Sequence, residues 1–321
     1  NTGIRTLNDD GYSGHGVRVC IVDTGIDTSH PDLLNTNLVG FKDFIHDTQG
    51  NPHDNDKTHS HGTMMSGIIA ANGTFVGGAP DVLLIVAAAL GSDGGSGSEV
   101  AVAEAIEWCW TEMAAEIISL SLGGKPDLVS TFGGETEVAV RAALDNGVFV
   151  VAAAGNHGGA GQDYPDVTIP ANVEGVISVG AIHRNSTLWQ FSSAGSITNS
   201  SGEIRQWPNQ KPEVVAPGVE IHSTFVSEAT GATWSRSDGT SDATVFVTAS
   251  LALILERYDG NPKLQPTHQG DRGPINLVKA ALADSCKSGV FQNSGEHHLR
   301  YGYGSLDAEA WSDMVGERLS E

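Results

Sequence analysis

Short apolar runs of strand length alternate with helix-length segments along most of the chain. The β-branched or continuously apolar runs predict strands over residues 17–23, 82–89, 116–122, 148–153, 176–181 and 213–218. Apolar positions at helical spacing predict helices over 64–71, 99–115, 135–146 and 275–283, and the stretch 238–258 predicts a polar loop leading into a buried helix. This order is typical of a mostly parallel sheet with right-handed connections, covered by helices. No linker or shift in composition divides the chain, so we expect one α/β domain over residues 1–321.

The charge balance narrows the choice of partners. The chain has 39 acidic and 17 basic residues, for a net charge of −22. The acidic residues are spread along the sequence, which indicates a solvated acidic surface and disfavours nucleic acid and anionic membranes as partners. The longest apolar run, over residues 82–90, is too short to span a bilayer. Asn1 is neither a methionine nor part of a signal peptide, so we expect a processed or shortened form of the protein.

Three cysteines, Cys20, Cys109 and Cys286, form an odd set without metal-ligand spacing. Cys20 lies in a predicted strand and Cys109 in a predicted helix, so we expect both to be buried core thiols. A disulfide between Cys109 and Cys286 is left open by the sequence.

Four polar residues fall at the ends of predicted strands or the starts of predicted helices: Asp23, His61, Asn156 and Ser241. These positions meet at one edge of a parallel sheet, where α/β proteins place their ligands. Each residue alone has a simpler interpretation. Asp23 and Asn156 stand beside glycines in turns, and Ser241 or Thr240 could cap the helix that follows.

Together these side chains supply what acyl transfer to a serine requires. Ser241 would attack, and His61 would take and return its proton. Asp23 would fix the tautomer of the imidazole and stabilise its charged form. Asn156 and a backbone N–H would hold the oxyanion.

The motifs around these residues resemble the subtilisin-like serine proteases, the subtilases. The matching stretches, in family order, are 22–27, 30–33, 61–63, 119–124, 153–156, 211–218, 239–241 and 301–304. The chain order Asp, His, Ser is also that of subtilisin. The resemblance runs from about residue 14 to 309. It implies a three-layer sandwich and a secreted, monomeric serine endopeptidase acting on proteins or peptides. It also implies a pro-segment, outside residues 1–321, that serves as inhibitor and folding chaperone.

The resemblance further implies a groove in which an extended peptide binds as an added strand. One edge of the groove would be Gly94, Gly95, Ser96 and Gly97, and the other Ser121, Leu122 and Gly123. The pocket for the side chain before the cut would be walled by 121–123 and by Ala152, Ala153, Ala154 and Gly155. These small, uncharged residues predict an apolar or broad preference.

The chain departs from the family pattern after the serine. Asp242 and Val245 stand where the family has methionine and proline. An unpaired carboxylate ~6 Å from the oxyanion would oppose it by roughly 3 kcal/mol at an effective dielectric of ~20, about a hundredfold in rate. We therefore expect Asp242 to be protonated, paired, screened or turned away, or the enzyme to be slow.

Bound ions are a further expectation. The loop 72–78 is shorter than the family's calcium-binding version, which puts that site in doubt. Asp54 and Asp56 offer the oxygen ligands that calcium prefers, so we expect a structural calcium there. A transition-metal cluster of His53, Asp54, Asp56, His59 and His61 matches no helical His pair.

Three other functions stay open. A catalytically impaired subtilase that binds peptides is suggested by the residues after Ser241. A metal hydrolase would use the region 53–61. An esterase of the nucleophile-elbow type lacks a Gly-x-Ser-x-Gly motif after a strand, since 95–97 precede a helix.

Overall fold

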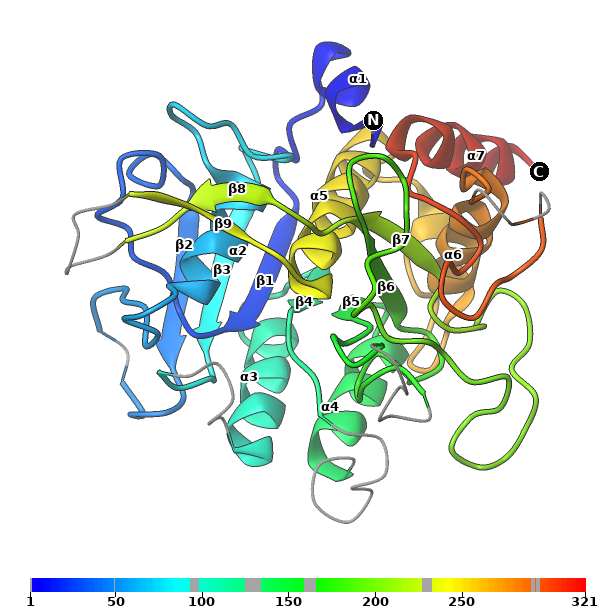
Figure 1. The fold of residues 1–321 in the computed structure, drawn as a ribbon, viewed down its shortest axis with the longest axis horizontal. Helices are drawn as coiled ribbons and strands as arrows, with labels where there is room; N and C mark the ends of the chain where they lie inside the picture. Colours follow the sequence, from blue (N-terminus) through cyan, green and yellow to red (C-terminus); the bar gives the residue numbers. More distant parts are fainter. Residues whose placement is uncertain are drawn as a thin grey trace.

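The computed structural model describes residues 2–48, 50–92, 98–124, 134–158, 166–226, 233–289, 292 and 295–321. Within them, seven parallel strands form one sheet in the order β2-β3-β1-β4-β5-β6-β7 (Figure 1). The strands are β1 (Arg18–Asp23), β2 (Leu38–Asp43), β3 (Leu83–Ala88), β4 (Ile117–Leu120), β5 (Phe149–Ala153), β6 (Ile177–Ile182) and β7 (Val214–Pro217). The predicted α/β fold is confirmed.

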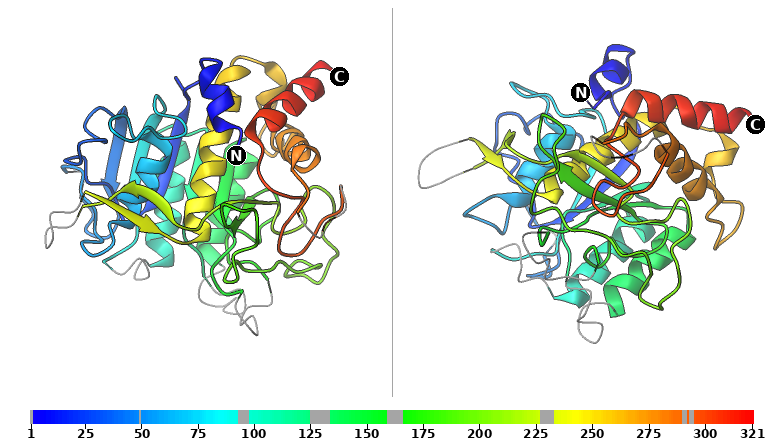
Figure 2. Two further views of the ribbon diagram at one scale, coloured as in Figure 1. Left: turned by 45° about the horizontal axis from the view of Figure 1, so that its top comes forward. Right: turned by 45° about the vertical axis from the view of Figure 1, so that its right-hand side comes forward.

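Helices cover both faces of the sheet (Figures 1 and 2). They are α1 (Ile4–Asp9), α2 (His61–Ala70), α3 (Glu99–Thr111), α4 (Gly134–Asp145), α5 (Thr240–Arg257), α6 (Gly273–Ser285) and α7 (Ala308–Ser320), with a 3₁₀ turn at Pro262–Leu264. A two-stranded antiparallel hairpin, β8 (Ile221–Thr224) and β9 (Trp234–Ser237), lies beside α2. None of the helices in the described part of the chain is long and apolar enough to cross a bilayer.

The α2–α5 pair and the α3–α4 pair lie on opposite faces of the sheet. The connections from β2 to β3 and from β3 to β4 step in the same direction across the sheet. With their helices, α2 and α3, on opposite faces, the two connections have opposite hands. The expectation of right-handed connections throughout is therefore wrong for one of them.

The apolar run of α5 is explained by its place in the core. The helix packs against β4, β5, β6 and β7 on one side and against α2 and α7 on others. Nearly every residue from Thr240 to Leu255 is buried, so the helix is apolar on most of its circumference rather than on one stripe. This fixes the start of α5, and with it Ser241, against the carboxyl edge of the sheet.

The expectation that Cys20 and Cys109 are buried is confirmed, but the expectation that they are thiols is wrong. Cys20 on β1 and Cys109 on α3 form a disulfide with a Cα–Cα distance of 5.9 Å, and Cys286 is a free thiol. Both bridged residues are fully buried, as predicted. Their pairing follows from the packing of α3 against β1, which the hydrophobic pattern does not specify.

Candidate active site

Asp23 and His61 are joined by a hydrogen bond. Asp23 ends β1 and is fully buried, whereas His61 begins α2 with 29% of its side chain exposed. The ring Nδ1 of His61 lies 2.7 Å from Asp23 Oδ1. That oxygen also accepts from the Thr24 N–H, at 2.7 Å, while Oδ2 is buried without a partner among the residues described. Because a carboxylate only accepts, the proton of a neutral His61 sits on Nδ1 and leaves Nε2 as a base.

The charges around His61 set its affinity for a second proton. Burial lowers its pKa, but the contact with Asp23 and the nearby carboxylates of Asp242 and Asp54 raise it, to a pKa of about 9. The carboxylates around the ring therefore favour its protonated form.

Ser241 is the second residue of α5. Its Oγ donates to the Ser121 carbonyl at 3.2 Å, and Ser121 Oγ donates back to the Ser241 carbonyl at 3.2 Å. The N-cap of the helix is Gly239, which has no side chain to bond the first-turn N–H groups. The alternative that Ser241 or Thr240 is the N-cap is thus wrong, and the start of α5 keeps its preference for negative charge.

Asn156 follows β5 and is held by Thr240. Its Oδ1 accepts from the Thr240 N–H at 3.0 Å and from the Thr240 hydroxyl at 2.9 Å. Both donors fix the orientation of the amide, so that its NH₂ group faces away from them. A Cβ placed on Gly239 would lie 3.5 Å from Ser241 N and 3.6 Å from Asn156 Nδ2. The same point would lie 3.5 Å from Asp242 Oδ2. Two nitrogens that can donate and one carboxylate oxygen therefore border this space beside the serine.

Asp242 is paired, one of the outcomes that the sequence left open. It is 1% exposed, and its Oδ1 accepts from the Ser237 hydroxyl at 2.5 Å. Burial raises its pKa to about 6, although the Ser237 bond and the charge of His61 partly offset this. The carboxylate and the imidazole therefore influence each other's charge.

The predicted pocket walls lie at the carboxyl ends of β4 and β5. Ser121 and the residues Ala152 to Gly155 are buried, Leu122 is half-buried and Gly123 is exposed. The predicted groove residues Gly94, Gly95, Ser96 and Gly97 lie outside the described residues.

Thr168 lies between the two walls, a position that no motif in the sequence indicated. A Cβ on Gly123 would come within 2.3 Å of Thr168 Oγ1, and a Cβ on Gly155 within 2.5 Å of its methyl carbon. The Thr168 hydroxyl donates to the Ala153 carbonyl at 2.9 Å, which fixes this side chain. The space between the walls is therefore partly filled.

The carboxylates of Asp54 and Asp56 are bonded to donors of the protein. Asp54 Oδ2 accepts from the N–H and the hydroxyl of Thr63, at 2.9 and 2.6 Å, and Asp54 Oδ1 from the Asp56 N–H at 2.9 Å. Asp56 Oδ1 accepts from the N–H groups of Thr58 and His59, at 3.0 and 2.9 Å. These bonds tie the loop to α2, and a calcium ion at this pair stays a prediction.

Asp32, in the segment 30–33 that resembles the family, is likewise surrounded by donors. Its carboxylate accepts from the N–H groups of Thr74 and Phe75, at 2.6 and 3.1 Å, and from the Trp234 indole at 2.9 Å. The short loop 72–78 is thus closed by direct hydrogen bonds.

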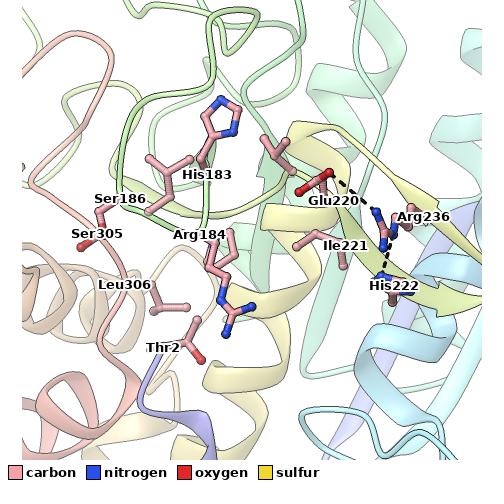
Figure 3. A pocket seen from close by; sticks show the side chains of 13 residues that line it. Thr2, His183, Arg184, Ser186, Glu220, Ile221, His222, Arg236, Ser305 and Leu306 are labelled. Carbon is pink, nitrogen blue, oxygen red and sulfur yellow. Dashed lines mark hydrogen bonds and ion pairs between the residues drawn. The ribbon is translucent and has the colours of Figure 1, made fainter.

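A separate cavity of about 310 Å³ lies at the carboxyl ends of β6 and β7 (Figure 3). Arg236, on its rim, lies 3.7 Å from Glu220 and donates to His222 at 2.7 Å. The lining residues include none of the four candidate catalytic residues. The cavity therefore belongs to another part of the molecule than the Asp23–His61 pair.

Comparison with known proteins shows the family to which the chain belongs. The model of the subtilase family matches residues 14–304. Subtilisin DY of Bacillus licheniformis is 38% identical over 305 residues, which cover 94% of this chain and 92% of that protein. The major intracellular serine protease of Bacillus subtilis (strain 168) is 36% identical over 247 residues, 76% of this chain and 70% of that protein.

A solved structure, that of the prenylagaramide maturation protease PagA, superposes with a TM-score of 0.74 over 98% of this chain and 99% of that one. At 22% identity this likeness concerns the fold alone. With the family model and the close relatives, the identity is clear: the chain belongs to the subtilase family and is a serine endopeptidase.

Proposed function

We propose that the enzyme cleaves peptide bonds through Ser241, His61 and Asp23. The observation that carries the proposal is the 2.7 Å bond between His61 Nδ1 and Asp23 Oδ1, formed at the start of α2, which packs against α5, the helix whose first turn holds Ser241. Nε2 of His61 takes the serine proton as the hydroxyl oxygen attacks the substrate carbonyl carbon. The imidazolium, stabilised by Asp23, then gives that proton to the leaving amine. Water then takes the place of the amine: His61 accepts a proton from the water that attacks the acyl carbon, and returns it to the Ser241 oxygen as that oxygen leaves.

The oxyanion of each tetrahedral intermediate is stabilised by the Asn156 amide and the Ser241 N–H. Support comes from the space that both nitrogens border beside Gly239 and from the two bonds by which Thr240 orients the amide. Donors held in place before the reaction stabilise developing charge without reorganising, which is commonly a large part of catalysis.

Substrate is proposed to bind as an extended strand along Ser121, Leu122 and Gly123. Its side chain before the cut enters between Gly123 and Gly155. Because Thr168 occupies part of that space, small apolar side chains should be preferred to large aromatic ones.

The proposal is tested with Ser241→Ala and a panel of chromogenic peptides. Wild type should take up a fluorophosphonate label at Ser241 and cleave peptides with alanine or valine before the cut faster than those with phenylalanine. Ser241→Ala should lose both the label and more than about 10⁴-fold of the activity. A wild-type protein that binds peptides but takes no label and cleaves none would instead be the catalytically impaired subtilase.

Secretion, a structural calcium, a pro-segment and a monomeric state are proposed with it. Secretion is supported by the Cys20–Cys109 disulfide, since such bonds persist mainly in oxidising compartments. The relatives divide on this point, because two of them are named as intracellular proteases. Cell fractionation of the source organism would decide it.

A further inference from the structure

Asp43 lies at the centre of a group that the acyl-transfer site does not use. It is the last residue of β2 and fully buried. Its Oδ1 accepts from the N–H groups of Ile45 and His46, at 2.8 and 3.2 Å. Its Oδ2 faces two imidazoles, with His46 Nδ1 at 2.6 Å and His53 Nε2 at 3.1 Å. One oxygen is thus used by the backbone, and the other is shared by two histidines.

The hydrogen bond at Nδ1 of His53 fixes the tautomer of the neutral ring, and with it what Nε2 can offer to Asp43. Nδ1 lies 2.9 Å from the Asn51 carbonyl, which can only accept, so Nδ1 carries a proton. In a neutral ring, Nε2 then presents a lone pair to Asp43 Oδ2, which is also an acceptor. The contact is favourable only if a cation stands between them or if a second proton makes the ring an imidazolium. A metal-binding histidine commonly donates its other ring N–H to a carbonyl in this way.

The distances suit a small divalent ion. Ligand atoms about 2.0–2.2 Å from a tetrahedral zinc ion lie roughly 3.3 Å apart. The His53–Asp43 distance of 3.1 Å is close to this value, whereas the His46–Asp43 distance of 2.6 Å must open by about 0.7 Å to reach it. His46 has 63% of its side chain exposed, so its ring is free to make this adjustment. All three ligand atoms lie within 4.8 Å of one another.

We propose that Asp43, His46 and His53 form a binding site for a divalent transition-metal ion of the zinc type. Two imidazoles and one carboxylate suit zinc, cobalt or nickel, whereas calcium prefers oxygen ligands alone. Water would complete the coordination at the exposed side of His46. The group differs from the alternative cluster of residues 53–61 considered from the sequence, since within the described ranges only these three residues form such a set.

The site adjoins the strands that carry the reaction. Asp23 on β1 and Asp43 on β2 both pair with Ala88 of β3, from opposite sides. The His53 carbonyl accepts from the Ile26 N–H at 3.0 Å, just beyond Asp23. A bound ion would therefore hold His46 and His53 near the segment that follows Asp23, and should raise the thermal midpoint of unfolding.

In the test, ZnCl₂ is titrated into protein from which metal has been removed with a chelator, and binding is followed by calorimetry. The Ser241→Ala variant is the background, to suppress self-digestion. We expect one equivalent of zinc with micromolar or tighter affinity and a thermal midpoint that rises with zinc. His46→Ala and His53→Ala should each weaken binding by about 100-fold or more, beyond the 10–100-fold typical of losing an indirect partner. His59→Ala is the matched control, an exposed histidine 3.6 Å from the buried Asp56, and should change nothing.

A second measurement uses the intact sequence, in case a variant fails to fold. Zinc should protect His46 and His53, but not His59, from acylation by diethyl pyrocarbonate, read by mass spectrometry. Zinc binding that is absent, or that survives unchanged in the His46→Ala,His53→Ala double variant, overturns the proposal. Equal acylation of the three histidines with and without zinc overturns it as well, and would leave the group as an imidazolium–carboxylate cluster.

Discussion

Two clusters of charged side chains in this molecule differ in how completely their charges are paired. In the first, Glu213 lies between Lys211 and Lys279, and all three side chains are at most 1% exposed. Both ammonium groups reach Glu213 Oε1, at 2.8 and 2.7 Å, and both donate to the Val176 carbonyl. The Ser178 N–H bonds Oε2 at 2.8 Å, so both carboxylate oxygens are satisfied. Burial lowers the pKa of Lys211 to about 7, and the two lysines hold that of Glu213 below its usual value.

The second group, Asp23, His61 and Asp242, is incompletely paired. Asp23 keeps one oxygen without a partner among the residues described, and His61 is partly exposed. Asp242 has a raised pKa, which shows that the fold opposes its charge. A group whose hydrogen bonds and charges are fully paired holds the structure in one arrangement. A group that is incompletely paired still has hydrogen-bonding capacity and shifted pKa values that a reaction can use.

Among variants of the two clusters, Asp23→Asn should have the largest effect, and that effect should be on catalysis. The amide can donate to His61 Nδ1, which selects the wrong tautomer, and it cannot stabilise the imidazolium. We expect kcat to fall by about 10⁴-fold with little change in KM. Steady-state kinetics on a chromogenic peptide measures this, and a loss of less than tenfold would remove Asp23 from the mechanism.

Glu213→Gln should give the opposite outcome. It removes the counter-charge of two buried lysines, which should lower the free energy of unfolding by about 3–5 kcal/mol. Urea denaturation measures the loss. Activity per folded molecule should stay within about twofold of wild type, and a selective fall in kcat would contradict the structural role.

The smallest effect expected is that of Asp242→Asn, which keeps an acceptor for Ser237. Removing a negative charge near His61 lowers the pKa of the imidazole from about 9, so more of it is a free base at pH 7. We expect kcat/KM at pH 7 to rise by about tenfold and the acid limb of the pH profile to move down. If the acid side of the pH profile does not move, the charge of Asp242 does not influence the pKa of His61.

The same variant should also change how the free energy of unfolding depends on pH, in a direction set by the raised pKa of Asp242. The folded-state pKa of Asp242, about 6, lies above the ordinary value of 3.8. Its contribution to stability is therefore full below 3.8 and lost as the pH rises through 6. Asp242→Asn should consequently gain stability relative to wild type above pH 6, by about 1–3 kcal/mol.

The sequence predicted best what local patterns determine. The apolar runs correctly predicted the strands β1, β3, β4, β5, β6 and β7. Because parallel strands end at one edge of a sheet, they also predicted that the residues at those ends lie near one another. β2 was not predicted as a strand, because asparagines precede it and its residues form no continuous apolar run; four of the six are half-buried. The hairpin β8–β9 and α7 were also not predicted, since each is stabilised by tertiary contacts more than by its own pattern.

Pairings between distant residues could not be predicted from spacing. Cys20 and Cys109 meet only because α3 packs on β1, and Thr168 reaches the pocket walls only through the fold. The Asp43 group escaped notice for the same reason, because ten residues separate Asp43 from His53 along the chain. The sequence suggested the region 53–61 instead, where histidines and aspartates are merely dense.

The Cys20–Cys109 bond joins two residues 89 positions apart, and the loop it closes contains His61 and the exposed turn at residues 57–59. A cut that the enzyme makes in its own chain anywhere inside this loop releases no fragment. Self-digested molecules would therefore migrate as intact on a non-reducing gel and separate into pieces only after reduction.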